Sequence, residues 1–371
     1  MKSIIEECYE KAKDCIDKNK FKKGIFASPG YHAIWARDSM ISLIGASATK
    51  NFKEMFRESL ITLASHQSKK GQIPNAVDKW SKRKSHVDYQ SIDSTLWFII
   101  GEYWYKHIYQ DSLIFNKHRK KIENALLWLG YQDFSESGLI VQLPTTDWQD
   151  AFPHKYGWTI NTQALYYCVL KIIKRDKEAE KLKILVNSDN DHCLWNGSFY
   201  NAYRWKNHGK YKEKGGWFDS LGNLLAILFG LADKDKSEKI LNYIQQKKIN
   251  QPYPIKAIFP PIEKGDTDWQ DYYLDCDAGK PFHYLNAGIW PYIGSFYILA
   301  LIKLKKFDEA EKELEKLAES NLKGNFPEWI NPLTKETYGS LQAWDAGTYI
   351  LAYESFKNKK LFFDCSNWVR Y

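Results

Sequence analysis

Residues 220–247 read SLGNLLAILFGLADKDKSEKILNYIQQK, and this stretch contains two helical patterns of opposite character. Its first part, residues 220–232, is apolar on nearly all sides, which predicts a helix that is buried on most faces. Its second part, residues 234–247, keeps apolar residues on one stripe among charged ones, which predicts a helix at the surface. We therefore expect an inner helix that pairs with an outer helix.

The same alternation runs along the whole chain. Six amphipathic, charged segments alternate with six segments that are apolar nearly all round, which predicts an all-α protein with an (α/α)6 barrel, in which six helical hairpins close into a ring. No Pro-, Gly- or Ser-rich linker divides the sequence, so we expect one catalytic domain over residues 1–371. The expected helices span about 4–18, 38–49, 52–67, 92–108, 111–129, 159–173, 177–186, 220–232, 234–247, 287–304, 308–320 and 341–356.

Five long connections precede the even-numbered segments. They cover about residues 68–90, 131–157, 188–217, 248–283 and 321–340. In a ring of hairpins, connections ahead of every second helix lie at one end of the barrel. Long loops within a compact domain usually carry function, so this end is the expected place of an active site.

The composition excludes several classes of protein. The 53 basic and 45 acidic residues give a net charge of +8, dispersed without a compact basic stripe, which argues against nucleic-acid binding. The most apolar run, residues 284–302, contains Asn286 and Pro291 and fits a buried helix better than a membrane span. The six Cys show no metal-ligand spacing, and the first residues show no signal peptide. We expect a reduced, cytoplasmic protein without metal or cofactor, whose oligomeric state is open.

One polar stretch is unusual. Residues 143–152 read LPTTDWQDAF and place Asp147, Trp148, Gln149 and Asp150 in consecutive positions shortly before an apolar run. Two carboxylates around an indole are costly as pure scaffold at the start of a buried helix. They suit a pocket that holds a sugar ring and protonates an atom on it. We interpret the chain as an enzyme that acts on carbohydrate.

Comparable polar and aromatic clusters stand at the starts of the other even-numbered helices. An acid at a helix start is often only a cap or a partner of the helix dipole. Six such clusters on one rim, each with Trp or Tyr, are poorly explained by capping alone. Besides residues 147–161, the clusters are 34–39, 91–97, 216–220, 283–290, and 326–329 with Gln342, Trp344 and Asp345.

These clusters resemble the motifs of the six-hairpin glycosidases. The chain is most similar to the glucosidase domain of glycogen-debranching enzymes, and more distantly to neutral invertases and glucoamylases. It departs from the family pattern around Tyr284 to Gly288, where His-Asn-Gly is commoner, and at Asp345, where Ser is commoner; both changes concern the choice of substrate. The similar stretches run in family order: IWARDSM (34–40), GQIPN (71–75), SIDSTLWF (91–98), DWQDA (147–151), LGNLLAI (221–227), HYLNAGIWP (283–291), PEW (327–329) and QAWDAG (342–347).

The resemblance implies a general acid at Asp150 and a general base at Glu328. Inverting glycoside cleavage needs such a pair, one carboxyl protonated for the leaving oxygen and one ionised to activate water. We expect burial beside Trp148 and the charge of Asp147 to raise the pKa of Asp150, and Glu328 to stay ionised. The alternatives are a helix cap at Asp150 and a surface acid at Glu328.

The resemblance also implies a set of substrate-binding residues. Asp38 suits a grip on two vicinal hydroxyls, with Arg37 orienting it, although a buried structural ion pair is an alternative. The Trp residues either stack on sugar faces or fill the barrel end. Asp268 and Asp271, in a second TDWQD stretch at 267–271, are rival acids that suit a lid or leaving-group subsite. The expected set is Trp35, Arg37, Asp38, Asp93, Trp97, Asp147, Trp148, Asn223, His283, Asn286, Trp290, Gln342 and Trp344.

The sequence as a whole predicts an inverting glycoside hydrolase. We expect it to release glucose, or a similar monosaccharide, from an α-linked oligosaccharide or a small glucoside. The alternatives are an inverting phosphorylase, in which phosphate replaces the activated water, and a sucrose-type invertase on the same fold. A third alternative is a sugar-binding protein without catalysis, which the presence of both carboxylates disfavours.

Overall fold

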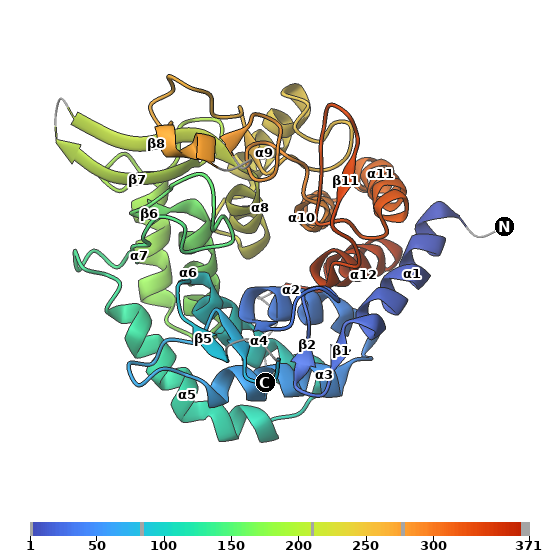
Figure 1. Cartoon of the computed structure of the whole chain (residues 1–371). Helices are drawn as coiled ribbons and strands as arrows, with labels where there is room; N and C mark the ends of the chain where they lie inside the picture. Colours follow the sequence, from blue (N-terminus) through green and yellow to red (C-terminus); the bar gives the residue numbers. More distant parts are fainter. Residues whose placement is uncertain (1–2, 82–84, 209–210, 276–278, 365–371) are drawn as a thin grey trace.

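Twelve α-helices dominate the computed structural model, which describes residues 3–81, 85–208, 211–275 and 279–364 (Figure 1). They lie where the hydrophobic periodicity predicts them, and most boundaries agree within two or three residues. They are α1 (Ile4–Lys18), α2 (Ala36–Ala46), α3 (Lys53–Ser65), α4 (Asp93–Tyr109), α5 (Leu113–Gly130), α6 (Ile160–Ile172), α7 (Asp176–Asn187), α8 (Ser220–Phe229), α9 (Lys234–Gln246), α10 (Pro291–Lys303), α11 (Phe307–Gly324) and α12 (Ala343–Lys357).

Two boundaries differ for clear physical reasons. Helix α10 begins at Pro291 and not near residue 287, because proline favours the first helical position and Ile289 forms backbone bridges in an extended conformation. Helix α8 ends at Phe229, because Gly230 follows with a φ of 82°. A glycine in this left-handed conformation ends a helix at little cost.

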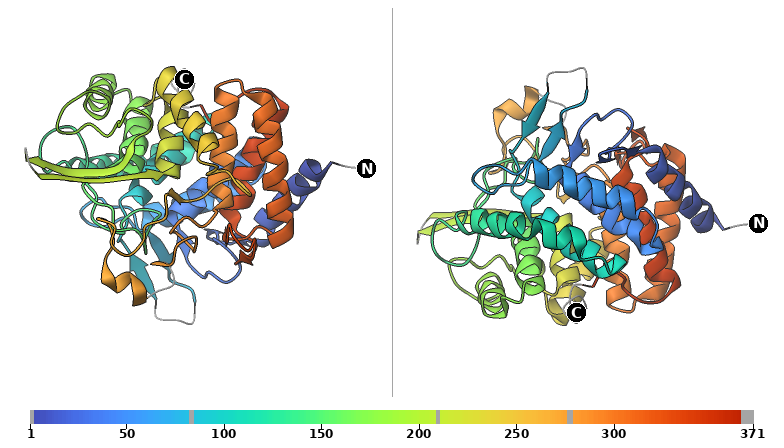
Figure 2. Two further views of the ribbon diagram at one scale, coloured as in Figure 1. Left: turned by 90° about the horizontal axis from the view of Figure 1, so that it is seen from above. Right: turned by 90° about the horizontal axis from the view of Figure 1, so that it is seen from below.

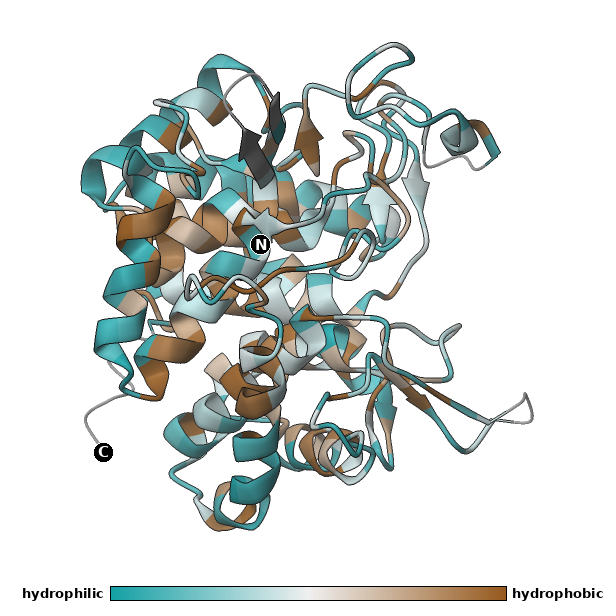
Figure 3. Ribbon diagram, turned by 90° about the vertical axis from the view of Figure 1, so that its left-hand side faces the viewer, coloured by the Kyte–Doolittle hydropathy of each residue, from teal (hydrophilic) through white to brown (hydrophobic). Residues whose placement is uncertain are grey.

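The even-numbered helices form the inside of the molecule. They contact one another in the closed order α2, α4, α6, α8, α10, α12 and back to α2, and the odd-numbered helices lie outside them (Figure 1). Every residue of α8 is buried, whereas α9 buries only Ser237, Ile240, Leu241 and Ile244. The expected alternation of inner and outer helices is confirmed. Figure 3 shows the same contrast, because the outer helices are hydrophilic along the side that faces solvent.

The contact between α2 and α12 closes this order of helices. It depends on two glycines, because a Cβ atom added to Gly45 would lie 2.2 Å from the carbonyl oxygen of Gly347. The two backbones therefore approach more closely than any larger residue allows.

Helix α10 contains most of the run that is the most apolar in the sequence. Every residue from Pro291 to Ile302 is buried, as expected of an inner helix. Among the described helices, none is both long and apolar enough to cross a bilayer. Cys8, Cys15, Cys168 and Cys193 form no disulfide within the described residues, and Cys276 and Cys365 lie outside them.

Short strands accompany the helices, so the expectation of an all-α chain is too strict. The longest are β7 (Asn201–His208) and β8 (Tyr211–Asp219), a hairpin that extends away from the helices within the expected loop 188–217 (Figure 2). The aromatic residues of this stretch favour strand, and the stretch lacks a helical stripe. The others are β1 (Lys20–Phe21), β2 (Gly24–Ile25), β3 (Ile34–Trp35), β4 (Ala76–Asp78), β5 (His86–Asp88), β6 (Trp158–Thr159), β9 (Ile258–Phe259), β10 (Trp329–Ile330) and β11 (Thr337–Tyr338).

These strands fix the starts of the inner helices. Strands β3, β6 and β8 lead directly into α2, α6 and α8, within sheets of the order β3-β4-β5 and β6-β7-β8-β9. Further backbone hydrogen bonds join residues at or just before the starts of α2, α4, α10 and α12 to neighbouring loop segments. They run from Ala36 N to Asn75 O (2.8 Å), from Ile92 N to Thr146 O (2.7 Å), from Ile289 N to Ile330 O (2.9 Å) and from Ala343 N to Ala27 O (2.8 Å).

Candidate active site

A small pocket lies among the starts of α2, α10 and α12 and the loop that precedes α6. Its volume is about 80 Å³, which suits no more than one sugar residue. Both expected catalytic acids line it, together with seven of the expected binding residues and two tyrosines. The lining residues are Tyr31, Trp35, Arg37, Asp38, Trp148, Asp150, Tyr284, Trp290, Glu328, Gln342 and Trp344.

Asp150 stands at the exposed side of the pocket, with 47% of its side chain accessible. Its surroundings raise the pKa of its carboxyl, first through desolvation by burial and then through the charges of Asp93 and Asp147, while Arg37 opposes the rise. Asp150 does not cap a helix, because the residue at the start of α6 that accepts the capping hydrogen bond is Thr159. The structure thus disfavours the helix-cap alternative.

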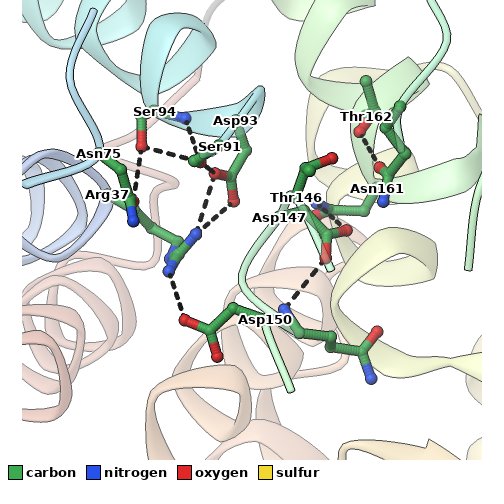
Figure 4. A network of polar contacts seen from close by, with 12 residues as sticks. Arg37, Asn75, Ser91, Asp93, Ser94, Thr146, Asp147, Asp150, Asn161 and Thr162 are labelled. Carbon is green, nitrogen blue, oxygen red and sulfur yellow. Dashed lines mark hydrogen bonds and ion pairs between the residues drawn. The ribbon is translucent and has the colours of Figure 1, made fainter. Parts of the chain in front are cut away.

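Arg37 is buried beneath Asp150 and is held by Asp93. Its Nη1 donates to both carboxylate oxygens of Asp93, at 3.0 and 3.1 Å, and its Nη2 lies 3.7 Å from Asp150 (Figure 4). Asp93 also accepts a hydrogen bond from Ser91 at 2.5 Å and does not line the pocket. Asp93 is therefore the hydrogen-bonded partner of Arg37, while Asp38 interacts with it by charge; the expected part of Asp93 in substrate binding stays a prediction.

Glu328 immediately precedes β10, and its N–H donates to the carbonyl of Tyr338 at 2.8 Å. Burial, followed by the charges of Asp38 and Asp150, raises the pKa of Glu328 to about 7, against a hydrogen bond from Tyr31 that lowers it. Glu328 is thus not fully ionised at neutral pH, which corrects one expectation. It also lines the pocket, so it is not a surface acid.

Three carboxyl groups therefore face a pocket with one cationic group. Burial raises the pKa of Asp38 to about 6, although Arg37 opposes the shift. Among the described residues of the lining, Arg37 has the only positive charge, and Asp93 already compensates it. Like charges in a confined site cannot all ionise together. Near neutral pH, the three carboxyl groups of the pocket are therefore expected to include both a protonated and an ionised one.

Indole rings form the wall of the pocket. Trp290 packs edge-to-face on Trp148, with ring centroids 5.5 Å apart, and on Trp344, at 5.8 Å. Trp35 packs edge-to-face on Tyr31 at 6.4 Å. Among the described residues, the indole N–H groups of Trp35, Trp148 and Trp344 have no hydrogen-bond partner although they are buried. Such donors suit the hydroxyl oxygens of a ligand, because an unpaired buried donor is costly.

Asp147 belongs to the support of the pocket and not to its lining. The fully buried Lys155 joins it to Asp219, with Nζ–O distances of 2.9 and 2.7 Å, and Asn161 donates to it at 3.2 Å. The ion pairs attach the loop that carries Asp150 to the start of α8. Asp147 thus takes part in a buried ion-pair network, and its expected role as a hydroxyl ligand stays a prediction. The sequence analysis did not predict Lys155.

Four further residues of the expected set lie outside the pocket lining. Asn223 binds the backbone of Tyr200 and Asp219, and Asn286 binds Ile262 and Gly279, so both amides are buried in structural hydrogen bonds. Trp97 is buried against Phe296, and His283 packs on Trp329 with ring centroids 4.5 Å apart. We assign none of the four to substrate binding.

The rival acids are also outside the lining. Asp268 accepts a hydrogen bond from the hydroxyl of Tyr203 at 2.5 Å, and Asp271 begins the short helix η2 (Asp271–Asp275). Within η2, Tyr273 packs on Phe152 and accepts a hydrogen bond from the N–H of His154 at 3.1 Å. This segment covers the chain that follows Asp150, which fits the expected lid better than a direct chemical role.

Two tyrosines of the pocket were not predicted. Tyr31 follows a Pro-Gly turn that resembles many others, and no signal in the sequence singles it out. Tyr284 lies within a motif that the sequence does show, but its place in the pocket depends on a backbone φ of 46°, which only the structure shows. Non-glycine residues with positive φ are uncommon and concentrate at functional sites.

The buried Asp345 adds a further unusual carboxyl. It lies in the first turn of α12, and burial raises its pKa well above the ordinary value. It lies outside the pocket lining. In the described residues, no group of three His, Cys, Asp or Glu is arranged to hold a metal ion.

Two family models match the chain in succession. The model of amylo-alpha-1,6-glucosidase matches residues 10–214, and that of alkaline and neutral invertase matches residues 206–359. The chain is 31% identical over 155 residues to neutral/alkaline invertase 1, mitochondrial, of Oryza sativa subsp. japonica, which is 40% of this chain and 23% of that protein. It is 28% identical over 142 residues to alkaline/neutral invertase C, mitochondrial, of Arabidopsis thaliana, which is 36% of this chain and 21% of that protein. The matches thus span less than a quarter of these relatives.

Solved structures share the fold over nearly the whole chain. The GH63 mannosylglycerate hydrolase from Thermus thermophilus, in complex with Tris and D-glycerate, superimposes with a TM-score of 0.70 at 12% identity and covers 92% of this chain and 99% of that one. A rhamnosidase from Klebsiella oxytoca with rhamnose bound has a TM-score of 0.64 at 15% identity, over 94% of this chain and 63% of that one. Since the amylo-alpha-1,6-glucosidase model matches more than half of the chain, the protein belongs to that family, within the six-hairpin glycosidase superfamily.

Proposed function

We propose that the protein is an inverting glycoside hydrolase that releases glucose, or a similar monosaccharide, from small α-linked glycosides. The observation that carries the proposal is the convergence of Asp150 and Glu328 on one small pocket from positions far apart in the sequence. In an inverting glycosidase, one carboxyl protonates the leaving oxygen and the other activates a water on the opposite side of the ring.

Asp150 suits the part of the acid. Its carboxyl is half-exposed at the side where a leaving group departs, and its surroundings raise its pKa. A raised pKa favours the protonated carboxyl, which can deliver its proton to the glycosidic oxygen.

Glu328 suits the part of the base. The hydrogen bond from Tyr31 favours its ionised form, and its pKa of about 7 lies near the operating pH, where general bases are most effective. In the proposed step, Glu328 accepts a proton from water as the water attacks the anomeric carbon, while Asp150 gives its proton to the leaving oxygen.

Sugar recognition falls to Asp38 and the indole wall. Asp38 offers acceptors for two neighbouring hydroxyl groups, and three indole N–H groups offer donors. The small volume of the pocket favours release of one terminal sugar at a time.

The finer description of the fold is also a proposal. We infer an (α/α)6 barrel in a single domain over residues 1–371, which the closed order of inner-helix contacts supports, as does the superposition over 92% of the chain. The cytoplasmic location stays a prediction. The names of the curated relatives place them in mitochondria, chloroplasts or the cytosol.

Two isosteric substitutions test the catalytic pair. Asp150→Asn and Glu328→Gln should each lower turnover of an α-glucoside about a hundredfold to ten-thousandfold, while the far-UV circular dichroism stays unchanged. Asp235→Asn and Glu336→Gln are matched controls outside the pocket and should keep wild-type turnover. NMR of the fresh product should show inversion at the anomeric carbon. Retention, or near-normal turnover of either pocket variant, would refute the mechanism.

A second candidate is hydrolysis of sucrose. The invertase model covers residues 206–359, a range that contains Trp290, Glu328 and Trp344 of the pocket. Release of glucose from sucrose, trehalose, maltose and isomaltose under identical conditions distinguishes the two candidates. Running the panel with and without phosphate tests the phosphorylase alternative. Saturable binding of these sugars without turnover of any of them would support a binding protein instead.

A further inference from the structure

A second, larger hollow lies beside the catalytic pocket. This groove has a volume of about 540 Å³ and lies between the end of α5, the segment 89–92 ahead of α4, and the segment 141–146. Two of the segments that line the groove are joined to each other, because the N–H of Ile92 donates to the carbonyl of Thr146 at 2.7 Å. Asp93 and Asp147, which support the pocket, directly follow these two residues.

None of the described residues that line the groove is charged. Thirteen side chains form it, and all are amides, hydroxyls, aromatic rings or aliphatic groups, in a chain with 26% charged residues. A site for nucleic acid, phosphate or an acidic peptide needs cationic side chains. The lining instead suits a neutral ligand that is rich in hydroxyl groups.

Two aromatic residues give the groove fixed apolar surface. Trp128 of α5 is half-buried, and the hydroxyl of Tyr89 donates to the carbonyl of His66 at 2.7 Å, which fixes the ring. Leu143 forms part of the rim and is 70% exposed. Rigid aromatic side chains bind at low entropic cost and present surface against which the apolar face of a sugar ring packs.

Gln142 supplies an unsatisfied donor. Its side chain is buried, and its Oε1 accepts hydrogen bonds from Thr159 at 2.6 Å and from Thr162 at 2.5 Å. The two hydroxyls fix the amide, and within the described chain its Nε2 has no partner. A buried donor without a partner costs free energy that an acceptor oxygen on a ligand would recover. The exposed amide of Gln90 lies on the same lining.

We propose that this groove is a second, non-catalytic carbohydrate site that binds neutral oligosaccharides. This groove proposal rests on the proposed hydrolase function only for the class of ligand, because neither Asp150 nor Glu328 lines the groove. The groove would hold a chain of several sugars near the catalytic pocket and so raise the effective concentration of its ends there.

Binding of defined heptasaccharides tests the groove. Maltoheptaose, isomaltoheptaose and the acidic heptagalacturonate would be titrated by calorimetry against the full chain carrying Glu328→Gln, so that the neutral sugars are not consumed. Trp128→Ala removes the aromatic ring, and Leu143→Asp places a charge on the rim. Leu113→Asp is the matched control, since Leu113 is 81% exposed on the same helix α5 but lies outside the groove.

We expect Trp128→Ala and Leu143→Asp each to weaken binding of at least one neutral heptasaccharide about tenfold, and Leu113→Asp to leave it unchanged. Heptagalacturonate should not bind. Without Glu328→Gln, hydrolysis of p-nitrophenyl α-glucoside should be equal in all groove variants, and this separate assay reports on the catalytic proposal. Equal affinity in all variants, no binding of either neutral sugar, or preference for the acidic one would overturn the groove proposal, whatever the glucoside assay shows.

Discussion

The Nη2 atom of Arg37 lies 3.7 Å from a carboxylate oxygen of Asp150, while Nη1 of the same guanidinium is within 3.1 Å of both oxygens of Asp93. The closer contacts of the Arg37 guanidinium are therefore with the buried Asp93 and not with Asp150. This division matters for catalysis, because a cation fully available to Asp150 would favour its ionised form. Asp93 thus helps Asp150 to keep the proton that an acid catalyst needs.

Replacing Asp93 by Asn should leave less of Asp150 protonated near neutral pH and so make it less available as the general acid. The substitution removes a negative charge that raises the pKa of Asp150 and leaves Arg37 free to lower it. The pKa of Asp150 then falls, so the alkaline limb of the profile of kcat/KM against pH should move to lower pH. Asp235→Asn, a control in an exposed ion pair on α9, should leave that limb in place. An unchanged limb in Asp93→Asn would show that Asp93 does not protect the proton of Asp150.

The pairing of Arg37 shows what the sequence can and cannot predict. Helix positions follow from local periodicity, and all twelve helices were predicted. Arg37 and Asp38 are neighbours in sequence, but successive side chains of a helix point about 100° apart, and Arg37 makes its hydrogen bonds to a different carboxylate. The actual partner, Asp93, is 56 residues away. Such a contact depends on the packing of α2 against α4, which local patterns do not determine.

The same reason explains the mixed outcome of the rim clusters. Local pattern places Trp290 and Asn286 at one helix start, but only Trp290 reaches the pocket. The positive φ of Ala287 turns the chain between the two, and Asn286 bonds to the backbone of Ile262. The burial of Lys155 was not predicted, because its ion pairs with Asp147 and Asp219 depend on tertiary structure. In the sequence alone, Lys155 cannot be told from an ordinary surface lysine.

Glu328 should reduce the stability of the protein at neutral and alkaline pH. Its pKa rises from an ordinary 4.5 to about 7 in the folded protein, so the native state binds the proton more tightly than the unfolded chain. The contribution of Glu328 to the free energy of unfolding is therefore fully present below about pH 4.5 and is lost as the pH rises through about 7. Glu328→Gln should raise the free energy of unfolding by about 1–3 kcal/mol at pH 8 and give no gain at pH 4.5.

Denaturant unfolding at these two pH values measures the effect. Glu336→Gln lies nearby in the chain, between β10 and β11, and is the matched control with no expected gain at either pH. A stabilisation by Glu328→Gln that is equal at pH 4.5 and pH 8 would contradict the linkage, since it would not depend on the proton.

Lys155 should be the most costly single charge to remove. Lys155→Met keeps the length of the side chain but leaves Asp147 and Asp219 buried without their cation. Breaking a buried ion pair by removing one partner costs about 3–5 kcal/mol. Lys239→Met, in the exposed pair with Asp235, should cost about 0–1 kcal/mol. Equal midpoints of urea unfolding for the two variants would show that the buried triad contributes little.

Gly339 should matter for catalysis although it has no side chain. A Cβ atom at this position would lie 2.9 Å from Cβ of Glu328 and 3.4 Å from its Oε2, and the φ of Gly339 is 68°. Gly339→Ala therefore pushes against the proposed base as well as straining the backbone. We expect kcat to fall about tenfold or more, because small displacements of a catalytic group are costly, with a smaller change in KM. Gly265→Ala separates the two effects, since Gly265 has a φ of 103° but no atom within 4 Å of its added Cβ. That control should lose stability through backbone strain and keep its kcat, whereas wild-type turnover in Gly339→Ala would show that Glu328 tolerates the displacement.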